Sequence, residues 1–238
     1  MRWTRAGLAP RDTTLTLALI SIVCVGVIMV TSTTLFVADQ YYGNALFFIK
    51  RHLAHLLIGG IAFTLGFIIP CNRWESLRLV ALVGSFICVG LIFLPGLGLQ
   101  INGATRWIHT PYGSIQPGEI SKLLFMIYVA AYCAKQRRGR RGLSNRDGAI
   151  ILSLLAVLSY AFCIQPDFGS CVVLAGVVLQ ILFIAGLPLQ TWCLLASIAT
   201  ICASVAVVWK PYRMMRLATF LDPWSVAFSS GYQLTQSL

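Results

Sequence analysis

Charged residues are scarce in this chain. Asp, Glu, Lys and Arg together make up 11% of its 238 residues, whereas hydrophobic residues make up 58%. A soluble domain of this length carries roughly 25% charged residues. Together with the long apolar runs, this deficit excludes an ordinary soluble domain and favours a membrane protein.

Acidic residues are the scarcer of the two charged classes. The chain has 7 Asp and Glu against 18 Lys and Arg, which gives a net charge of +11. A basic excess can indicate a nucleic-acid partner. In a chain of apolar spans, however, the Lys and Arg bias of cytoplasmic loops explains it first, and we expect no nucleic acid.

Several catalytic motifs are also missing. We find no Gly-rich phosphate loop ending in Lys-Ser/Thr, no G-x-S-x-G, no H-E-x-x-H and no S-x-x-K. The histidines, His52, His55 and His109, lack the spacing of zinc ligands. Hydrolysis by an activated serine or by protein-bound zinc is therefore unsupported, and no metal ligand is identified.

The eight cysteines form no C-x-x-C pair. They lie in or at the ends of apolar runs, at positions 24, 71, 88, 133, 163, 171, 193 and 202. We interpret them as small apolar residues of helices, and expect neither a disulfide framework nor a zinc site.

The apolar runs predict an all-α, polytopic membrane helical bundle. About 20 apolar residues span a bilayer as a helix. The spans predicted from the sequence are 15–37, 53–70, 79–99, 117–134, 149–164, 168–187 and 190–209. Pro95-Gly96 should break the third, and Gln165-Pro166-Asp167 should join the fifth and sixth in a tight hairpin. The predicted organisation is a tail at 1–14, the bundle at 15–209 and a loop from 210 to 238.

The distribution of cations predicts the orientation. The N-terminal run Leu15–Val37 follows Arg2, Arg5 and Arg11 and lacks a cleavage site, so it is interpreted as a signal anchor. These arginines share one side with Arg73, Arg78 and the basic run from Lys135 to Arg146. The N-terminus is therefore predicted to be cytoplasmic, and the segment from Lys210 to lie outside.

Two polar stretches lie before and at the start of the fourth predicted span. Pro117 suits the first position of a helix, and Glu119 then lies in the first turn, where the helix dipole favours a negative charge. Glu119 and Lys122 are three residues apart and can pair, facing a cavity or a partner helix, or snorkelling to the interface. Arg106 could bind phosphate as a planar fork beside Trp107, although an aromatic belt also explains that tryptophan.

Two further polar stretches follow. In Gln165-Pro166-Asp167-Phe168-Gly169, Asp167 is expected to cap a helix in a tight turn. Lys210, Arg213 and Arg216 gather on the side where cations are disfavoured, and Arg213 and Arg216 share a face if this segment is helical. They would either anchor a helix end at lipid phosphates or bind an anionic ligand outside the membrane.

These stretches occur in an order that resembles the SEDS family (shape, elongation, division and sporulation). The resemblance rests on Asn102–Trp107, Gln116–Lys122, Gln165–Gly169 and the run from Tyr212 to Leu238, and it covers nearly the whole chain from Leu15. Within the family, the ending Gly-Tyr-Gln-Leu-Thr-Gln-Ser-Leu is more similar to the division member than to the elongation member. About ten membrane helices are therefore implied for the whole protein.

The resemblance implies a peptidoglycan glycosyltransferase of the bacterial inner membrane, acting at the division septum. It would polymerise lipid II with a monofunctional penicillin-binding transpeptidase and other membrane proteins of the division complex. A divalent cation, Mg²⁺ or Mn²⁺, is also implied. The implied substrate-binding residues are Arg106, Trp107, Lys122, Arg213 and Arg216, and the implied cavity-shaping or partner-pairing residues are Glu119, Gln165 and Asp167.

The family's catalytic Asp is expected beyond Leu238, so no catalytic residue is assigned within these residues. Two alternatives stay open. A lipid II flippase would need cations along a path through the bilayer, for which Lys122 is the main candidate. A non-catalytic division scaffold, or a truncated remnant, would keep the partner surface and lack the general base.

Overall fold

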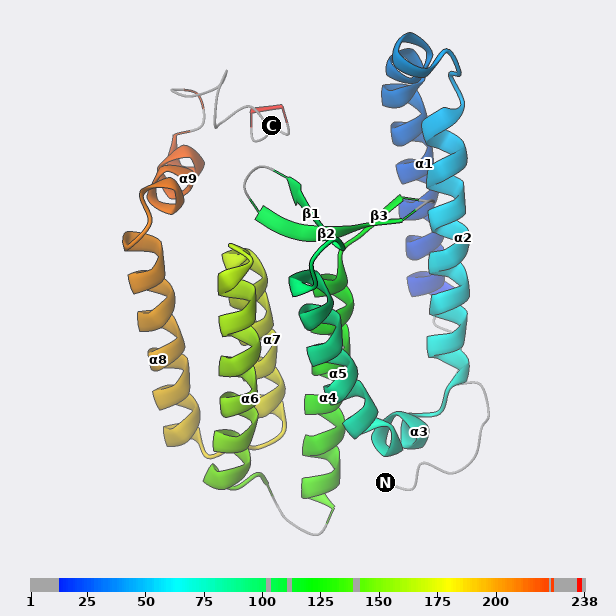
Figure 1. The fold of residues 1–238 in the computed structure, drawn as a ribbon. Coiled ribbons are helices and arrows are strands. Elements are labelled where there is room, and N and C mark those ends of the chain that lie inside the picture. The colour runs from blue at the N-terminus through cyan, green and yellow to red at the C-terminus, as the bar shows by residue number, and fades with distance from the viewer. Residues whose placement is uncertain are drawn as a thin grey trace. The chain divides into compact units, whose positions relative to one another are not determined.

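The computed structural model describes residues 13–101, 104–110, 113–138, 142–222, 224 and 235–236. It divides into two units, Met1–Arg73 and Trp74–Leu238 (Figure 1). By length and composition, four helices among the described residues could cross a membrane: α1 (Thr13–Tyr42), α2 (Phe47–Ile68), α6 (Asn145–Ile164) and α8 (Leu189–Val208). The predicted fold class, a helical bundle of a membrane protein, is confirmed.

The first unit is a helical hairpin of α1 and α2. Gly43, at φ 61°, allows the reversal between the helices because glycine adopts left-handed backbone without a steric cost. Apart from the buried Ala38, the apolar side chains of this hairpin are largely exposed. The hydroxyls of Thr34 and Thr64 donate to carbonyls four residues back. Each hydroxyl thus has a hydrogen-bond partner within its own helix, which lipid hydrocarbon could not provide. Both helices are therefore suited to lipid.

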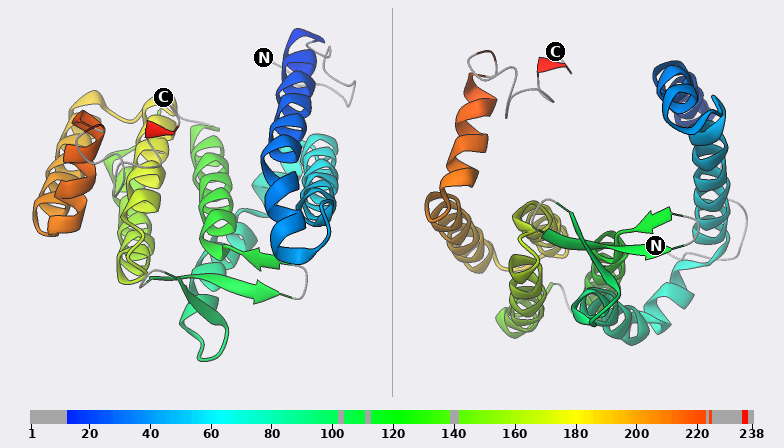
Figure 2. Two further views of the ribbon diagram at one scale, coloured as in Figure 1. Left: turned by 90° about the horizontal axis from the view of Figure 1, so that it is seen from above. Right: turned by 45° about the horizontal axis from the view of Figure 1, so that its top comes forward.

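The second unit holds the core of the protein. It contains α4 (Arg78–Gly90), η1 (Leu91–Phe93), β1 (Gly98–Ile101), β2 (Ala104–Thr110), β3 (Gly113–Ile115), α5 (Pro117–Arg137), α6, α7 (Phe168–Ile184), α8 and α9 (Pro211–Leu221). The short helix α3 (Cys71–Ser76) crosses the boundary between the units. Helix α7 contacts α5, α6 and α8, and Figure 2 shows these neighbours from two further sides. Fully buried side chains such as Phe125, Phe162 and Leu174 come from α5, α6 and α7.

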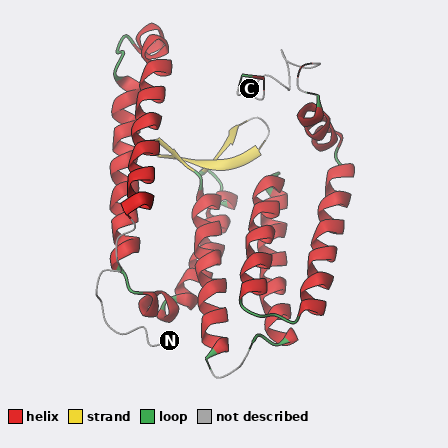
Figure 3. Ribbon diagram, turned by 180° about the vertical axis from the view of Figure 1, so that it is seen from behind, coloured by secondary structure: helices red, strands yellow, loops and turns green. Residues whose placement is uncertain are grey.

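A three-stranded antiparallel sheet, in the order β1-β2-β3, caps one end of these helices (Figure 3). The same end carries the turn Gln165–Asp167 between α6 and α7, and α9 after α8 (Figure 1). We call it the sheet end. The opposite end carries the end of α5, the start of α6 and the connection from α7 to α8. The polar stretches singled out in the sequence of this unit therefore lie at the sheet end or begin there.

The structure corrects the third predicted span. The helix was expected to run over 79–99 with a break at Pro95-Gly96, but it ends with η1 at Phe93. A turn follows, in which Gly96 has φ 86°, and β1 begins at Gly98. The sheet itself was not predicted, although β2 contains the β-branched and aromatic residues that favour strands. The other predicted spans coincide with helices whose ends differ by a few residues.

Candidate functional site

A bulge in β2 positions Arg106. The register passes from Leu99 opposite Trp107 to Gln100 opposite Thr105, so Arg106 is an extra residue without its own partner in β1. Such a bulge bends the strand and re-aims a side chain. Here the Arg106 side chain reaches the turn between α6 and α7, almost sixty residues further along the chain.

Arg106 binds this turn through its whole guanidinium. Its Nε donates to the carbonyl of Gln165 at 3.2 Å, and a terminal nitrogen donates to the carbonyl of Pro166. Its Nη1 lies 3.8 Å from Oδ1 of Asp167. Carbonyls at the end of a helix carry partial negative charge, which a cation stabilises. The fork expected to bind phosphate therefore already holds the end of α6.

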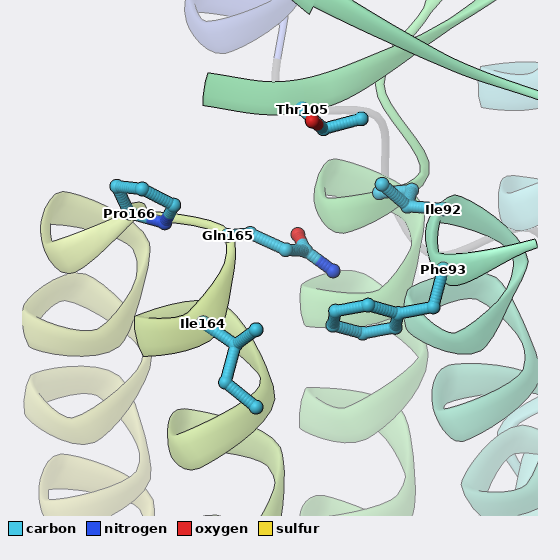
Figure 4. Close-up of a pocket in the computed structure, with 6 residues that line it drawn as sticks. All are labelled: Ile92, Phe93, Thr105, Ile164, Gln165 and Pro166. Carbon is cyan, nitrogen blue, oxygen red and sulfur yellow. The ribbon is translucent and has the colours of Figure 1, made fainter. Parts of the chain in front are cut away.

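Gln165 links the same turn to α4. Its side chain is buried, and its Nε2 donates to the carbonyl of Val89 at 3.2 Å. It also lines a pocket of about 300 Å³ between η1, β2 and the turn (Figure 4). The pocket residues are Ile92, Phe93, Thr105, Ile164, Gln165 and Pro166. Its volume is at the lower limit of small-molecule sites, so it suits a small chemical group.

Asp167 caps α7, as the sequence predicted. Its Oδ1 accepts from the Ser170 backbone N–H at 3.4 Å, and its Oδ2 accepts from the Ser170 hydroxyl at 2.7 Å. The side chain also pairs with Arg106. Asp167 thus joins a local helix cap to a contact from a distant strand, and its carboxylate is committed to holding the turn.

Arg213 connects α9 to the neighbouring helices. Its Nη1 donates to the carbonyl of Ala206 in α8 at 2.7 Å, and its guanidinium carbon lies 4.5 Å from the centre of the Phe168 ring. The segment is helical, as the shared face with Arg216 required. The side chain of Arg216 lies outside the described part of the structure. Both interpretations of the cluster, anchoring and anion binding, therefore stay open.

The predicted pair in the first turns of α5 is confirmed. Pro117 is at the start of the helix, and Lys122 Nζ lies 2.8 Å from Oε1 of Glu119. The Lys122 side chain is 12% exposed and that of Glu119 is 60% exposed. The lysine is thus the shielded partner, and the carboxylate presents the accessible charge of this pair.

The structure brings only some of the predicted site residues together. Arg106, Gln165 and Asp167 form one network, and Arg213 contacts Phe168 beside it. Glu119 and Lys122 pair with each other. Trp107 is half-buried in β2. The motif residues Asn102 and Gly103 lie outside the described residues, as do Pro223, 225–234 and 237–238 of the final stretch.

Sequence reasoning missed two partners in this network. The carbonyl of Val89 belongs to an apolar helix, and nothing in its sequence distinguishes it from its neighbours. Phe168 stands in the quoted motif, but its contact with Arg213 depends on how α8 and α9 pack. Both contacts are decided by tertiary structure rather than by a local pattern.

The described residues do not supply a ligand set for the implied divalent cation. Among them, no group of three or more His, Cys, Asp and Glu side chains could hold a metal ion. We therefore assign no step to a metal, and the cation stays a prediction for the whole protein.

Comparisons with known proteins agree on one family. The family model described as cell cycle protein, which covers FtsW, RodA and SpoVE, matches residues 12–238. A "Probable peptidoglycan glycosyltransferase FtsW" of Thioalkalivibrio sulfidiphilus is 36% identical over 95% of this chain and 56% of its own length. The protein of the same name from Alcanivorax borkumensis is 38% identical over 90% of this chain and 55% of its own. The chain thus spans about half the length of these relatives.

Solved structures share the fold. The rod shape determining protein RodA of Thermus thermophilus matches with a TM-score of 0.56 and 23% identity, over 76% of this chain and 58% of that one. A chain from a solved peptidoglycan synthase complex, described under "Structural coordination of polymerization and crosslinking", matches with a TM-score of 0.59 and 24% identity, over 89% of this chain and 63% of that one. At these identities the likeness concerns the fold alone.

Proposed function

The chain belongs to the FtsW/RodA/SpoVE family of multi-pass membrane proteins, and from this premise we propose that the whole protein is a peptidoglycan glycosyltransferase. The names of relatives that match over 90–95% of this chain support the proposal. Because the chain spans about half their length, the activity is proposed for the whole protein. We expect it to act at the division septum of the inner membrane, with a cytoplasmic N-terminus.

One observation carries the assignment of the site. Cationic side chains from three segments far apart in sequence, in β2, α5 and α9, belong to elements that start from or lie at the sheet end. Polymerisation of lipid II releases a lipid pyrophosphate, and preorganised cations stabilise the negative charge that develops on such a leaving group. This chemistry requires cations on the outer side of the membrane, where the sheet end is expected to lie.

The contacts separate two roles among these cations. Arg106 holds the α6–α7 turn, so we propose that it positions the site rather than binding phosphate directly. Arg213, oriented by Phe168 and Ala206, is proposed to face the anionic substrate together with Arg216, whereas the shielded Lys122 is neutralised by Glu119 and is proposed to hold the start of α5. The acceptor hydroxyl needs a carboxylate base, expected beyond Leu238.

The proposed partner is a monofunctional penicillin-binding transpeptidase, within a complex of other division membrane proteins. The structurally similar synthase complex is described as coordinating polymerization and crosslinking, which supports pairing a polymerase with a crosslinking enzyme. Lipid II is the proposed substrate, and a divalent cation the proposed cofactor.

The test is polymerisation of labelled lipid II by the purified full-length protein with its transpeptidase, followed on gels. Arg213→Ala combined with Arg216→Ala should lower the polymer yield at least about tenfold, because two cations leave the proposed pyrophosphate site. Arg146→Ala is the matched control, since it removes an exposed arginine near the start of α6, at the opposite end. It should leave the yield unchanged.

The outcomes separate the alternatives. A normal polymer yield from the Arg213 and Arg216 double variant would overturn the pyrophosphate assignment. Movement of lipid II across vesicles without any polymer would favour the flippase. Altered transpeptidase binding with an unaltered polymer yield would favour the scaffold.

A further inference from the structure

Two cysteines face each other across the α6–α7 turn. The Sγ atoms of Cys163, at the end of α6, and Cys171, in the first turn of α7, lie 3.7 Å apart. A disulfide has an S–S distance of about 2.05 Å, so a small side-chain movement would bring the two sulfurs within bonding distance. The residues are eight positions apart and enclose the turn that Arg106 and Gln165 hold.

The packing aims both thiols at the same interface. The Cys171 thiol donates to the carbonyl of Ser159 at 3.3 Å, so this side chain faces α6. Ser159 and Cys163 are four residues apart and therefore share one face of α6. Cys171 is buried at 8% exposure, whereas Cys163 is exposed. The Cys163 thiol is thus accessible to an oxidant, and the buried Cys171 thiol is placed to react with it afterwards.

The position of the pair suits oxidation. The turn lies at the sheet end, which the distribution of Lys and Arg predicts to face the outer side of the membrane. Disulfides form and persist in the compartments outside the bacterial cytoplasm. Sequence spacing predicted no disulfide among the eight cysteines, because only the hairpin brings these two together.

We propose that Cys163 and Cys171 form a redox modification site, at which a disulfide closes across the α6–α7 turn. The oxidant is a protein disulfide of the thiol oxidoreductase class. The Cys163 thiolate attacks this disulfide and forms a mixed disulfide, and the Cys171 thiolate then displaces the oxidant. One S–S bond forms in the chain, each cysteine loses its thiol proton, and two electrons reduce the oxidant to a dithiol.

The link would secure the turn covalently. Arg106 already constrains the same turn without a covalent bond, because it donates to the carbonyls of Gln165 and Pro166. The disulfide would add a second constraint on this backbone. Oxidation should therefore raise the melting temperature by a few degrees, because a cross-link restricts the unfolded chain.

The test maps the cysteines of the full-length protein in its own membranes. Thiols are trapped with acid and alkylated before extraction, and the protein is cleaved after Phe168, which separates Cys163 from Cys171. We expect the two peptides to remain joined without reductant and to separate with it. Cys163→Ser and Cys171→Ser should each abolish the joined product. Cys193→Ser, which removes an exposed cysteine of α8, should keep it.

Two results would overturn the proposal: alkylation of both Cys163 and Cys171 without reductant, or a link of either one to a different cysteine. If a single serine variant fails to accumulate, the native protein still gives a decisive answer, because its peptides are either joined or free. The result does not depend on the proposed activity, since it reports the covalent state of the chain and not its catalysis.

Discussion

The two ends of the Trp74–Leu238 unit hold their turns in different ways. At the opposite end, a buried carboxylate forms a local cap: Asp147, only 4% exposed, accepts from the Ser144 backbone N–H at 2.9 Å in a capping box. The long-range contacts of its arginines are exposed: Arg138 pairs with Glu75 at 2.7 Å with the arginine 65% exposed, and Arg137 donates to the carbonyl of Ile184 at an exposed position. At the sheet end, the long-range side-chain contacts are more shielded than these, because the buried Gln165 donates to Val89 and Arg106 is only 32% exposed.

This difference indicates which end depends on tertiary structure. Shielded polar contacts are worth more than solvated ones, and they cost more when one partner is removed. The sheet end is therefore expected to lose its geometry when a single distant residue changes. The opposite end should tolerate loss of its exposed ion pair and respond mainly to loss of its local cap.

The largest expected effect is at Arg106. Arg106→Ala removes the donors to the carbonyls of Gln165 and Pro166 and the partner of Asp167. We expect the free energy of unfolding to fall by about 2–4 kcal/mol, and the melting temperature in detergent by roughly 5–10 °C.

Arg106→Lys is the matched control for this change. It keeps the charge but lacks the planar fork that contacts both carbonyls, so it should recover less than half of the loss. If Arg106→Ala melted within a degree of the parent protein, the sheet end would not depend on its long-range contacts.

A smaller loss is expected at the cap of the opposite end. Asp147→Ala removes the acceptor for Ser144 and for the Tyr132 hydroxyl, which lies 3.1 Å away. Helix caps contribute about 1 kcal/mol, and the contact with Tyr132 should raise the cost to about 2 kcal/mol. Thermal unfolding of Ser144→Ala, Asp147→Ala and the double variant measures this.

The two changes at this cap should not be additive, because both remove the hydrogen bond that the Ser144 hydroxyl donates to the Asp147 carboxylate at 2.7 Å. A double variant that loses the sum of both single losses would mean that Ser144 and Asp147 act separately. The local cap would then not be a unit.

The predictable features of this unit are the ones decided within a few residues. Pro117 opens α5, Asp167 caps α7, and Glu119 pairs with Lys122, because each depends only on helix geometry and its nearest neighbours. The apolar runs predicted the helices for the same reason. The tight hairpin between α6 and α7 followed from a polar turn of three residues.

The features that could not be predicted depend on packing between distant segments. Arg106 has a fork that suits phosphate, a carboxylate or helix-end carbonyls equally, and only the approach of the α6–α7 turn decides among them. The proximity of Cys163 to Cys171 depends likewise on the hairpin. The sheet was missed because the run after Phe93 is apolar enough to be interpreted as the end of a membrane helix.

The pair in α5 tests how a shielded charge behaves near the sheet end. Glu119→Gln leaves Lys122, 12% exposed, without its carboxylate, and should cost about 1 kcal/mol in thermal unfolding. Exchanging the two residues, Glu119→Lys with Lys122→Glu, restores the pair. It also places a cation in the first turn, where the helix dipole disfavours it, so recovery should be partial. Full recovery would show that the dipole plays no part here.

The smallest effect is expected at the exposed ion pair of the opposite end. Arg138→Ala removes the partner of Glu75, and solvated pairs of this kind contribute about 0–1 kcal/mol. A double-mutant cycle with Glu75→Ala, measured by thermal unfolding at low and high salt, isolates the interaction. The coupling should be below about 1 kcal/mol and should shrink as salt screens the charges. A coupling as large as the loss at Arg106, and insensitive to salt, would mean that both ends depend on long-range contacts and that the contrast between them does not hold.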